Sequence, residues 1–165
     1  MNKGISLIEV IVGSAIISIA MFGIFRFLSF SVANSAISAQ FAQANALVQG
    51  GMEGVRAFRD GTAWTNNDPN DLYDGIGILQ IGASYKLQKS GDNPPQWQLV
   101  PGTETVGAFQ RTIVFSNVNR DGGDSIAESG GSLDDDTKKA TVQVAWSNRG
   151  QTYQAQISAY LTNWR

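Results

Sequence analysis

Apolar residues fill the N-terminal part of the chain almost without interruption. Between Ile5 and Phe25 only Glu9 carries a formal charge. Wound as a helix, this run is about 30 Å long, which matches the hydrocarbon thickness of a typical bilayer. The pattern therefore predicts a membrane-spanning helix over residues 5–28.

A periodic pattern replaces the continuous one after this run. Apolar side chains recur there mostly at three- and four-residue spacing, which is typical of one face of an amphipathic helix. The stripe comprises Phe30, Ile37, Phe41, Ala44, Val48, Met52, Val55 and Phe58. Asp60-Gly61 is a helix stop signal, so the helix is predicted to continue over residues 29–60. Gly50-Gly51 weakens it by roughly 1 kcal/mol per glycine, which favours a bend there.

Strict alternation of apolar and polar residues marks the C-terminal third of the chain. It runs through residues 140–146 and again through residues 153–161, and Ser147-Asn148-Arg149-Gly150 joins the two segments. This combination predicts a β-hairpin. Residues 112–118 are rich in β-branched and aromatic side chains and predict a further strand. One apolar face per strand indicates an antiparallel sheet covered on one side, and the helical stripe is its natural cover.

Turn-forming residues dominate the connecting region that follows the helix, residues 61–106. Two short alternating segments, residues 85–88 and 96–99, flank Pro94-Pro95 and predict another hairpin. The expected fold class is therefore α+β, with a long N-terminal helix packed on an antiparallel sheet. The globular head spans residues 61–165.

The composition restricts which catalytic and metal-binding sites this chain can form. It has 165 residues and a net charge of −2, with neither cysteine nor histidine. Disulfides, thiolate or histidine metal sites and histidine-based catalytic triads are thereby excluded. The net charge also argues against a broad electrostatic grip on nucleic acid. We therefore expect a protein that is not an enzyme and requires no cofactor.

Glu9, near the start of the apolar run, helps to distinguish three interpretations of that run. A secretory signal peptide has an apolar region of about 7–15 residues followed closely by a cleavage site. Here the run is longer, and the nearest Ala-x-Ala patterns lie within residues 42–46, far past its end. A plain membrane anchor explains the length but not Glu9, since a carboxylate at the bilayer centre costs about 2.5–3.5 kcal/mol.

Cleavage after Gly4 is the third interpretation, and it supplies a partner for the acid. Ile5 would then carry a free α-amino group, four residues before Glu9. The ammonium and the carboxylate can pair within one chain, because positions i and i+4 share a helix face. They can equally pair between neighbouring chains, which would make Glu9 an assembly device. Both arrangements remain open.

The segment Lys3-Gly4-Ile5-Ser6-Leu7-Ile8-Glu9-Val10 resembles the processing signature of type IV prepilins and type II secretion pseudopilins. The resemblance implies that residues 1–4 are a leader peptide. A prepilin peptidase would cut after Gly4 and methylate Ile5, and Glu9 would guide docking with other pilin or pseudopilin subunits. It also implies a pilin-like fold, an inner-membrane assembly platform and the lipid bilayer as partners, and a structural role.

Two departures from the family pattern restrict the kind of pilin subunit that the resemblance implies. Ile5 stands where the family usually has phenylalanine, and no proline precedes Pro69, whereas many major pilins carry helix-bending prolines. We therefore expect a minor pilin or a pseudopilin. It would cross the cytoplasmic membrane once with its head outside, then join a cell-surface pilus or a periplasmic pseudopilus. The alternatives are a nucleic-acid-binding subunit of a DNA-uptake pilus and a membrane-anchored binding domain that never polymerises.

One segment of the head matches the spacing of a calcium-binding loop. With Gly122 at the sixth position, the candidate ligands are Asn117, Asn119, Asp121, Gly123, Ser125 and Glu128. Against calcium, the first position is Asn, Asp124 occupies the usually apolar eighth position, and no helices flank the segment. The competing interpretation is a polar loop between strands. Residues 134–136 are three aspartates that would add ligands or form a solvated acidic turn.

Several aromatic residues in the head also lack an assigned role. They are Trp64, Tyr73, Trp97 and Trp164. Such side chains either gather into a binding surface or cover the edges of a small sheet. The sequence leaves both interpretations open.

Overall fold

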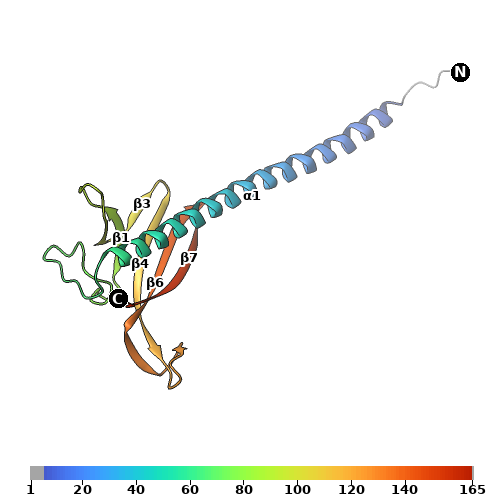
Figure 1. Ribbon diagram of the computed structural model, residues 1–165. Helices are drawn as coiled ribbons and strands as arrows, with labels where there is room; N and C mark the ends of the chain where they lie inside the picture. Colours follow the sequence, from blue (N-terminus) through green and yellow to red (C-terminus); the bar gives the residue numbers. More distant parts are fainter. Residues whose placement is uncertain (1–5, 165) are drawn as a thin grey trace. The chain divides into compact units, whose positions relative to one another are not determined.

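The computed structural model describes residues 6–164 and divides into two compact units. The first unit ends at Gln40 and the second begins at Phe41. A single element, α1 (Leu7–Gly61), contributes to both (Figure 1). Its end at Gly61 confirms the stop signal in the sequence. The predicted processing positions Gly4 and Ile5 lie outside the described residues.

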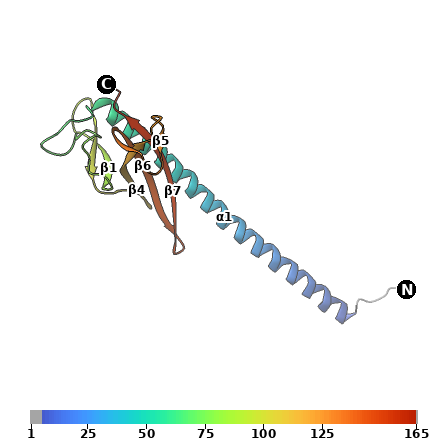
Figure 2. The same cartoon turned by 90° about the horizontal axis from the view of Figure 1, so that it is seen from below.

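An antiparallel sheet forms most of the second unit. In residues 6–164 it has seven strands, with the order β2-β1-β4-β6-β7, and both β3 and β5 pair with β4. Their bounds are β1 (Ser84–Lys89), β2 (Trp97–Pro101), β3 (Glu104–Val106), β4 (Phe109–Arg120), β5 (Ile126–Ala127), β6 (Ser132–Asn148) and β7 (Gln151–Thr162). Figure 2 shows β4, β6 and β7 side by side. The α+β class, with a long helix on an antiparallel sheet, is confirmed.

Both predicted hairpins are present. Strands β6 and β7 pair without interruption up to Asn148 and Gln151, and the two residues between them have positive φ, 51° at Arg149 and 80° at Gly150. A two-residue turn with positive φ at both positions matches the twist of the flanking strands. Strands β1 and β2 pair in the expected antiparallel sense from Lys89 opposite Trp97.

The second half of α1 supplies the cover that the sheet needs. The buried apolar residues of the helix are the C-terminal five of the predicted stripe, namely Ala44, Val48, Met52, Val55 and Phe58. They pack in one core with Ile113, Phe115, Val142 and Val144 of the sheet. Phe41 remains partly exposed, although its ring meets that of Trp146 edge-on at 4.8 Å.

Glycines let the sheet approach the helix closely. The helix continues through Gly50 and Gly51, and both Gly51 and Gly54 are buried. A methyl group on Gly51 would lie 2.8 Å from Val142 Cγ1, and one on Gly54 would lie 2.5 Å from Leu87 Cδ1. Both distances are shorter than van der Waals contact. These two positions therefore serve packing against the sheet rather than helix propensity.

The acidic segment 134–136 lies in β6, so the expectation of a turn is wrong, while Asp135 and Asp136 are exposed to solvent as expected. The pairing of β4 with β6 shifts register, because Asn117 faces Lys138 while the next residue, Val118, faces Asp134. Thr137, within this irregularity, is buried. A bulge of this kind adds residues to one strand without ending the pairing, which explains how the strand accommodates three acids in a row.

Candidate assembly and binding sites

Glu9 lies in the first turn of α1. Its backbone N–H donates to the carbonyl oxygen of Ser6 at 2.9 Å, which fixes the beginning of the helix. The exposed N–H groups of a helix start carry partial positive charge, so an acid is more favourable there than in the middle of the helix. The helix terminus thus offsets part of the cost of a carboxylate beside an apolar run.

The first unit presents an apolar surface over its whole described length. An 18-residue window of α1 has a mean hydropathy of 2.3 and none of it is buried, which by length and composition is sufficient to cross a membrane. Large side chains along it are more than half exposed, among them Leu7, Ile16, Ile19, Phe22, Phe27 and Val32. Apolar surface on this scale is unfavourable in water. It is compatible with a single-pass membrane anchor.

Three polar side chains in and just after this run, those of Ser14, Ser18 and Arg26, have local partners. The hydroxyl of Ser14 donates to the carbonyl oxygen of Ile11 at 2.9 Å, and that of Ser18 donates to the carbonyl oxygen of Ser14 at 2.8 Å. The guanidinium of Arg26 lies 5.4 Å from the ring centroid of Phe22. Hydroxyls bonded back to their own helix leave no donor unsatisfied in an apolar medium.

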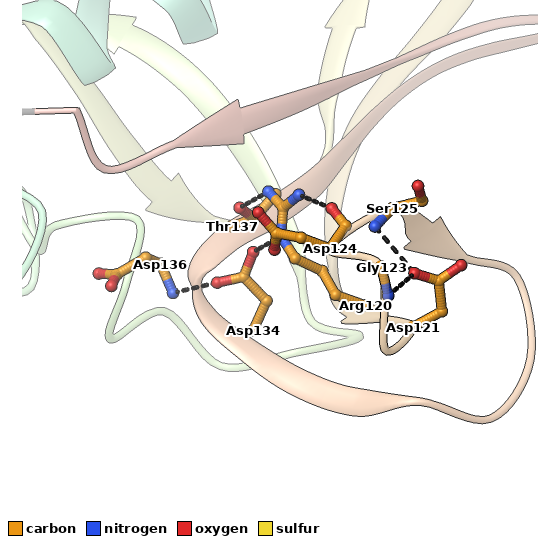
Figure 3. Close-up of polar contacts among 8 residues, drawn as sticks. All are labelled: Arg120, Asp121, Gly123, Asp124, Ser125, Asp134, Asp136 and Thr137. Carbon is orange, nitrogen blue, oxygen red and sulfur yellow. Dashed lines mark hydrogen bonds and ion pairs between the residues drawn. The ribbon is translucent and has the colours of Figure 1, made fainter.

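The candidate calcium loop contains a tight turn centred on Asp121. One carboxylate oxygen of Asp121 accepts the backbone N–H groups of Gly123 at 2.8 Å and Ser125 at 3.0 Å (Figure 3). Asp124 adopts a φ of 64°, which an aspartate tolerates better than most residues. Asp121 therefore acts as a turn former, as its position between two strands requires.

The first two candidate ligands, Asn117 and Asn119, lie in β4 rather than in the loop. The side-chain oxygen of Asn117 accepts the Lys138 ammonium at 3.0 Å, and the side-chain amide of Asn119 donates to the Gly130 carbonyl at 2.8 Å. Asn117 and Glu128 line one hollow of about 280 Å³. Within residues 6–164, no three acidic side chains group in a way that could hold a metal ion.

Arg120 joins the end of β4 to the start of β6. Its Nε donates to Asp134 Oδ2 at 2.6 Å, while its Nη atoms donate to the Asp124 carbonyl at 2.8 Å and to the Thr137 hydroxyl at 3.3 Å (Figure 3). The hydrogen bond from the Thr137 hydroxyl, followed by that from Arg120, lowers the pKa of Asp134. The same contact with Asp134 raises the pKa of Arg120. This cluster could not be predicted from the sequence, because the bulge that brings its members together is a tertiary feature.

The aromatic residues left open by the sequence fall into two groups. Trp97 lies under the Lys89 ammonium at 5.1 Å, and the Tyr73 hydroxyl accepts from the Gln98 amide at 2.9 Å, so both belong to the β1–β2 side of the sheet. Trp64 and Trp164 instead line one hollow of about 480 Å³. Only the second pair is arranged as the binding-surface interpretation requires.

Comparisons of the chain with protein-family models, with curated proteins and with solved structures found no match.

Proposed function

We propose that this chain is a structural subunit of a type IV pilus or pseudopilus, most consistent with a minor pilin. A prepilin peptidase cuts it after Gly4 and methylates Ile5, and the mature subunit polymerises through its N-terminal helix. Before assembly it crosses the cytoplasmic membrane once, with the head outside. Afterwards it belongs to a cell-surface pilus or a periplasmic pseudopilus.

One observation carries this proposal. An acid, Glu9, occupies the first turn of a helix whose apolar surface is exposed, and it lies four residues after Ile5 of the segment Lys3-Gly4-Ile5. A plain membrane anchor does not explain the presence of that acid. A subunit that exchanges lipid contacts for contacts with neighbouring helices does explain it, because burial between helices requires the acid to pair with a positive group.

The energetic scale supports a role in selecting the register of assembly. An unpaired carboxylate deep in a bilayer costs about 2.5–3.5 kcal/mol on insertion scales. Each 1.4 kcal/mol changes an equilibrium constant tenfold. The penalty for a misregistered subunit is therefore at most about 100-fold, because Glu9 lies in the first turn and not at the helix centre. The amine created at Ile5 is the nearest positive group, whether it belongs to the same chain or to a neighbour.

Replacement of Glu9 tests the docking role. In cells with a prepilin peptidase and an assembly platform, we expect Glu9→Gln to enter the membrane normally. Its incorporation into filaments should fall at least about tenfold, because the amide cannot pair with the ammonium. The measurement compares the subunit in sheared filaments with that in the membrane fraction.

Glu53→Gln is the matched control. Glu53 lies on the same helix, is exposed, and pairs with Arg56 at 2.6 Å, where an exposed pair contributes little. This variant should assemble as the wild type does. Normal filament incorporation of Glu9→Gln would remove Glu9 from the docking role and favour a membrane-anchored binding domain that does not polymerise.

A further inference from the structure

The hollow that contains Trp64 and Trp164 is formed where the end of α1 meets the end of the chain. Its lining is Arg59, Gly61, Thr62, Ala63, Trp64, Thr65, Thr162, Asn163 and Trp164. Its volume of about 480 Å³ lies within the range of small-molecule sites, roughly 300–1,000 Å³. Two segments far apart in sequence thus build one concave surface with an indole on each.

Trp64 is held in place from several sides. Its indole N–H donates to the Asp135 carbonyl at 3.3 Å, and its own carbonyl accepts the N–H of Gly77 at 2.9 Å. Gly77 packs so close that a methyl group there would lie 2.4 Å from the indole nitrogen. The ring also packs against the hydrophobic core. Its position is therefore set before any ligand arrives.

The segment that carries Trp164 is anchored just as firmly. Asn163 donates from its backbone N–H to the Asp136 carbonyl at 2.7 Å and from its side chain to the Asp136 carboxylate at 2.9 Å. The Arg59 guanidinium lies 4.6 Å from the centroid of the Trp164 ring. Trp164 is nevertheless 63 % exposed. A large aromatic side chain held at the surface on a fixed backbone offers an apolar surface to a ligand.

The charges around the hollow select the class of ligand. Among the described residues, Arg59 is the one charged side chain in the lining, and its groups are engaged by Asp60 at 2.9 Å and by the Thr162 carbonyl at 2.5 Å. An anion would gain little from this guanidinium, because Asp60 already neutralises its charge. A cationic ligand would be repelled by it from the face of Trp164. A neutral ligand remains.

We propose that this hollow binds a neutral saccharide. The C–H groups on one face of a pyranose ring are slightly positive and an indole face is negative, so the sugar would stack on the face of Trp164 opposite the Arg59 guanidinium. The hydroxyl groups of the sugar need donors and acceptors, which Thr62, Thr65 and Asn163 supply at the rim. The head would thereby recognise glycan, a property that does not depend on polymerisation of the chain.

Isothermal titration calorimetry on the full-length protein tests the proposal. The protein is placed in bilayers of phosphatidylethanolamine and phosphatidylglycerol, since maltoside detergents would compete for the site. The probes are maltotriose, cellotriose and the trimer of N-acetylglucosamine, each used up to about 10 mM to cover a millimolar dissociation constant. We expect saturable binding of at least one of the three.

Variants connect that binding to the hollow. Trp164→Ala should weaken it about tenfold, the scale of one lost aromatic contact, whereas Trp164→Phe should keep most of it. Trp97→Ala, outside the hollow, should bind as the wild type does. The proposal is overturned if none of the three trisaccharides binds, if Trp164→Ala binds unchanged, or if choline chloride binds more tightly than every trisaccharide.

Discussion

Two adjacent glycines in α1 should respond in opposite directions to the same substitution. Gly50 and Gly51 lie in the helix interior, where alanine is favoured over glycine by roughly 1 kcal/mol. Gly50 is exposed, and a methyl group there would meet only Arg111 Nη1, at 4.0 Å. Gly50→Ala should therefore raise the free energy of unfolding by up to about 1 kcal/mol.

Gly51→Ala should lower the stability despite the same gain in helix propensity. The new methyl group would lie 2.8 Å from Val142 Cγ1 and 3.1 Å from Arg111 Cδ. Val142 is fully buried on β6 between two paired strands, and a β-branched side chain has little rotamer freedom. Overpacking of this kind costs about 1–3 kcal/mol. The net loss should be about 1 kcal/mol, so the two variants should differ by about 2 kcal/mol.

Tryptophan fluorescence during thermal unfolding measures this difference. All four tryptophans lie after residue 60, so the signal reports on the head rather than on the exposed apolar part of the helix. For a domain of this size, 1 kcal/mol corresponds to roughly 4 °C in Tm. We expect Gly50→Ala to melt about 8 °C above Gly51→Ala. If Gly51→Ala melts at or above Gly50→Ala, the close-approach argument is wrong.

Two further predictions concern side chains near the end of β4, namely Asp134 and Glu128. Because the pKa of Asp134 is lowered in the fold, its contribution to stability is present above the unfolded pKa of about 3.9 and is lost as pH falls through the lower folded pKa. Asp134→Asn should thus destabilise the head in urea unfolding at pH 7 but much less near pH 3; an equal loss at both pH values contradicts this. The calcium interpretation of residues 117–128 requires a calcium-dependent rise in Tm that Glu128→Gln removes, and calcium would have to displace the Lys138 ammonium from Asn117. An unchanged Tm with calcium rejects the site.

Local patterns were sufficient to predict the elements of the head that depend on neighbours in sequence. The β6–β7 hairpin follows from two alternating segments and a turn that ends in glycine. The buried face of α1 follows from three- and four-residue spacing. In both cases the side-chain period and the turn chemistry agree, so tertiary contacts had nothing to override.

Features that depend on contacts between distant segments could not be read in the same way. The three aspartates at 134–136 resemble a turn in the sequence. No local pattern predicts the bulge opposite Asn117, and none predicts that Arg120 pairs with Asp134. Gly51 looks like a weak point of the helix until Val142 is known to face it. Trp64 and Trp164 are a hundred positions apart in the numbering, so only the folded chain brings them to one hollow.

The most direct test of the central claim is the mass of the mature N-terminus. The full-length protein is produced in cells that contain a prepilin peptidase, purified from the membrane, and its N-terminal peptide is analysed by mass spectrometry. The proposed function predicts a chain that begins at Ile5 and carries one added methyl group. A terminus that retains Met1–Gly4, or one that begins near residue 45, would contradict it.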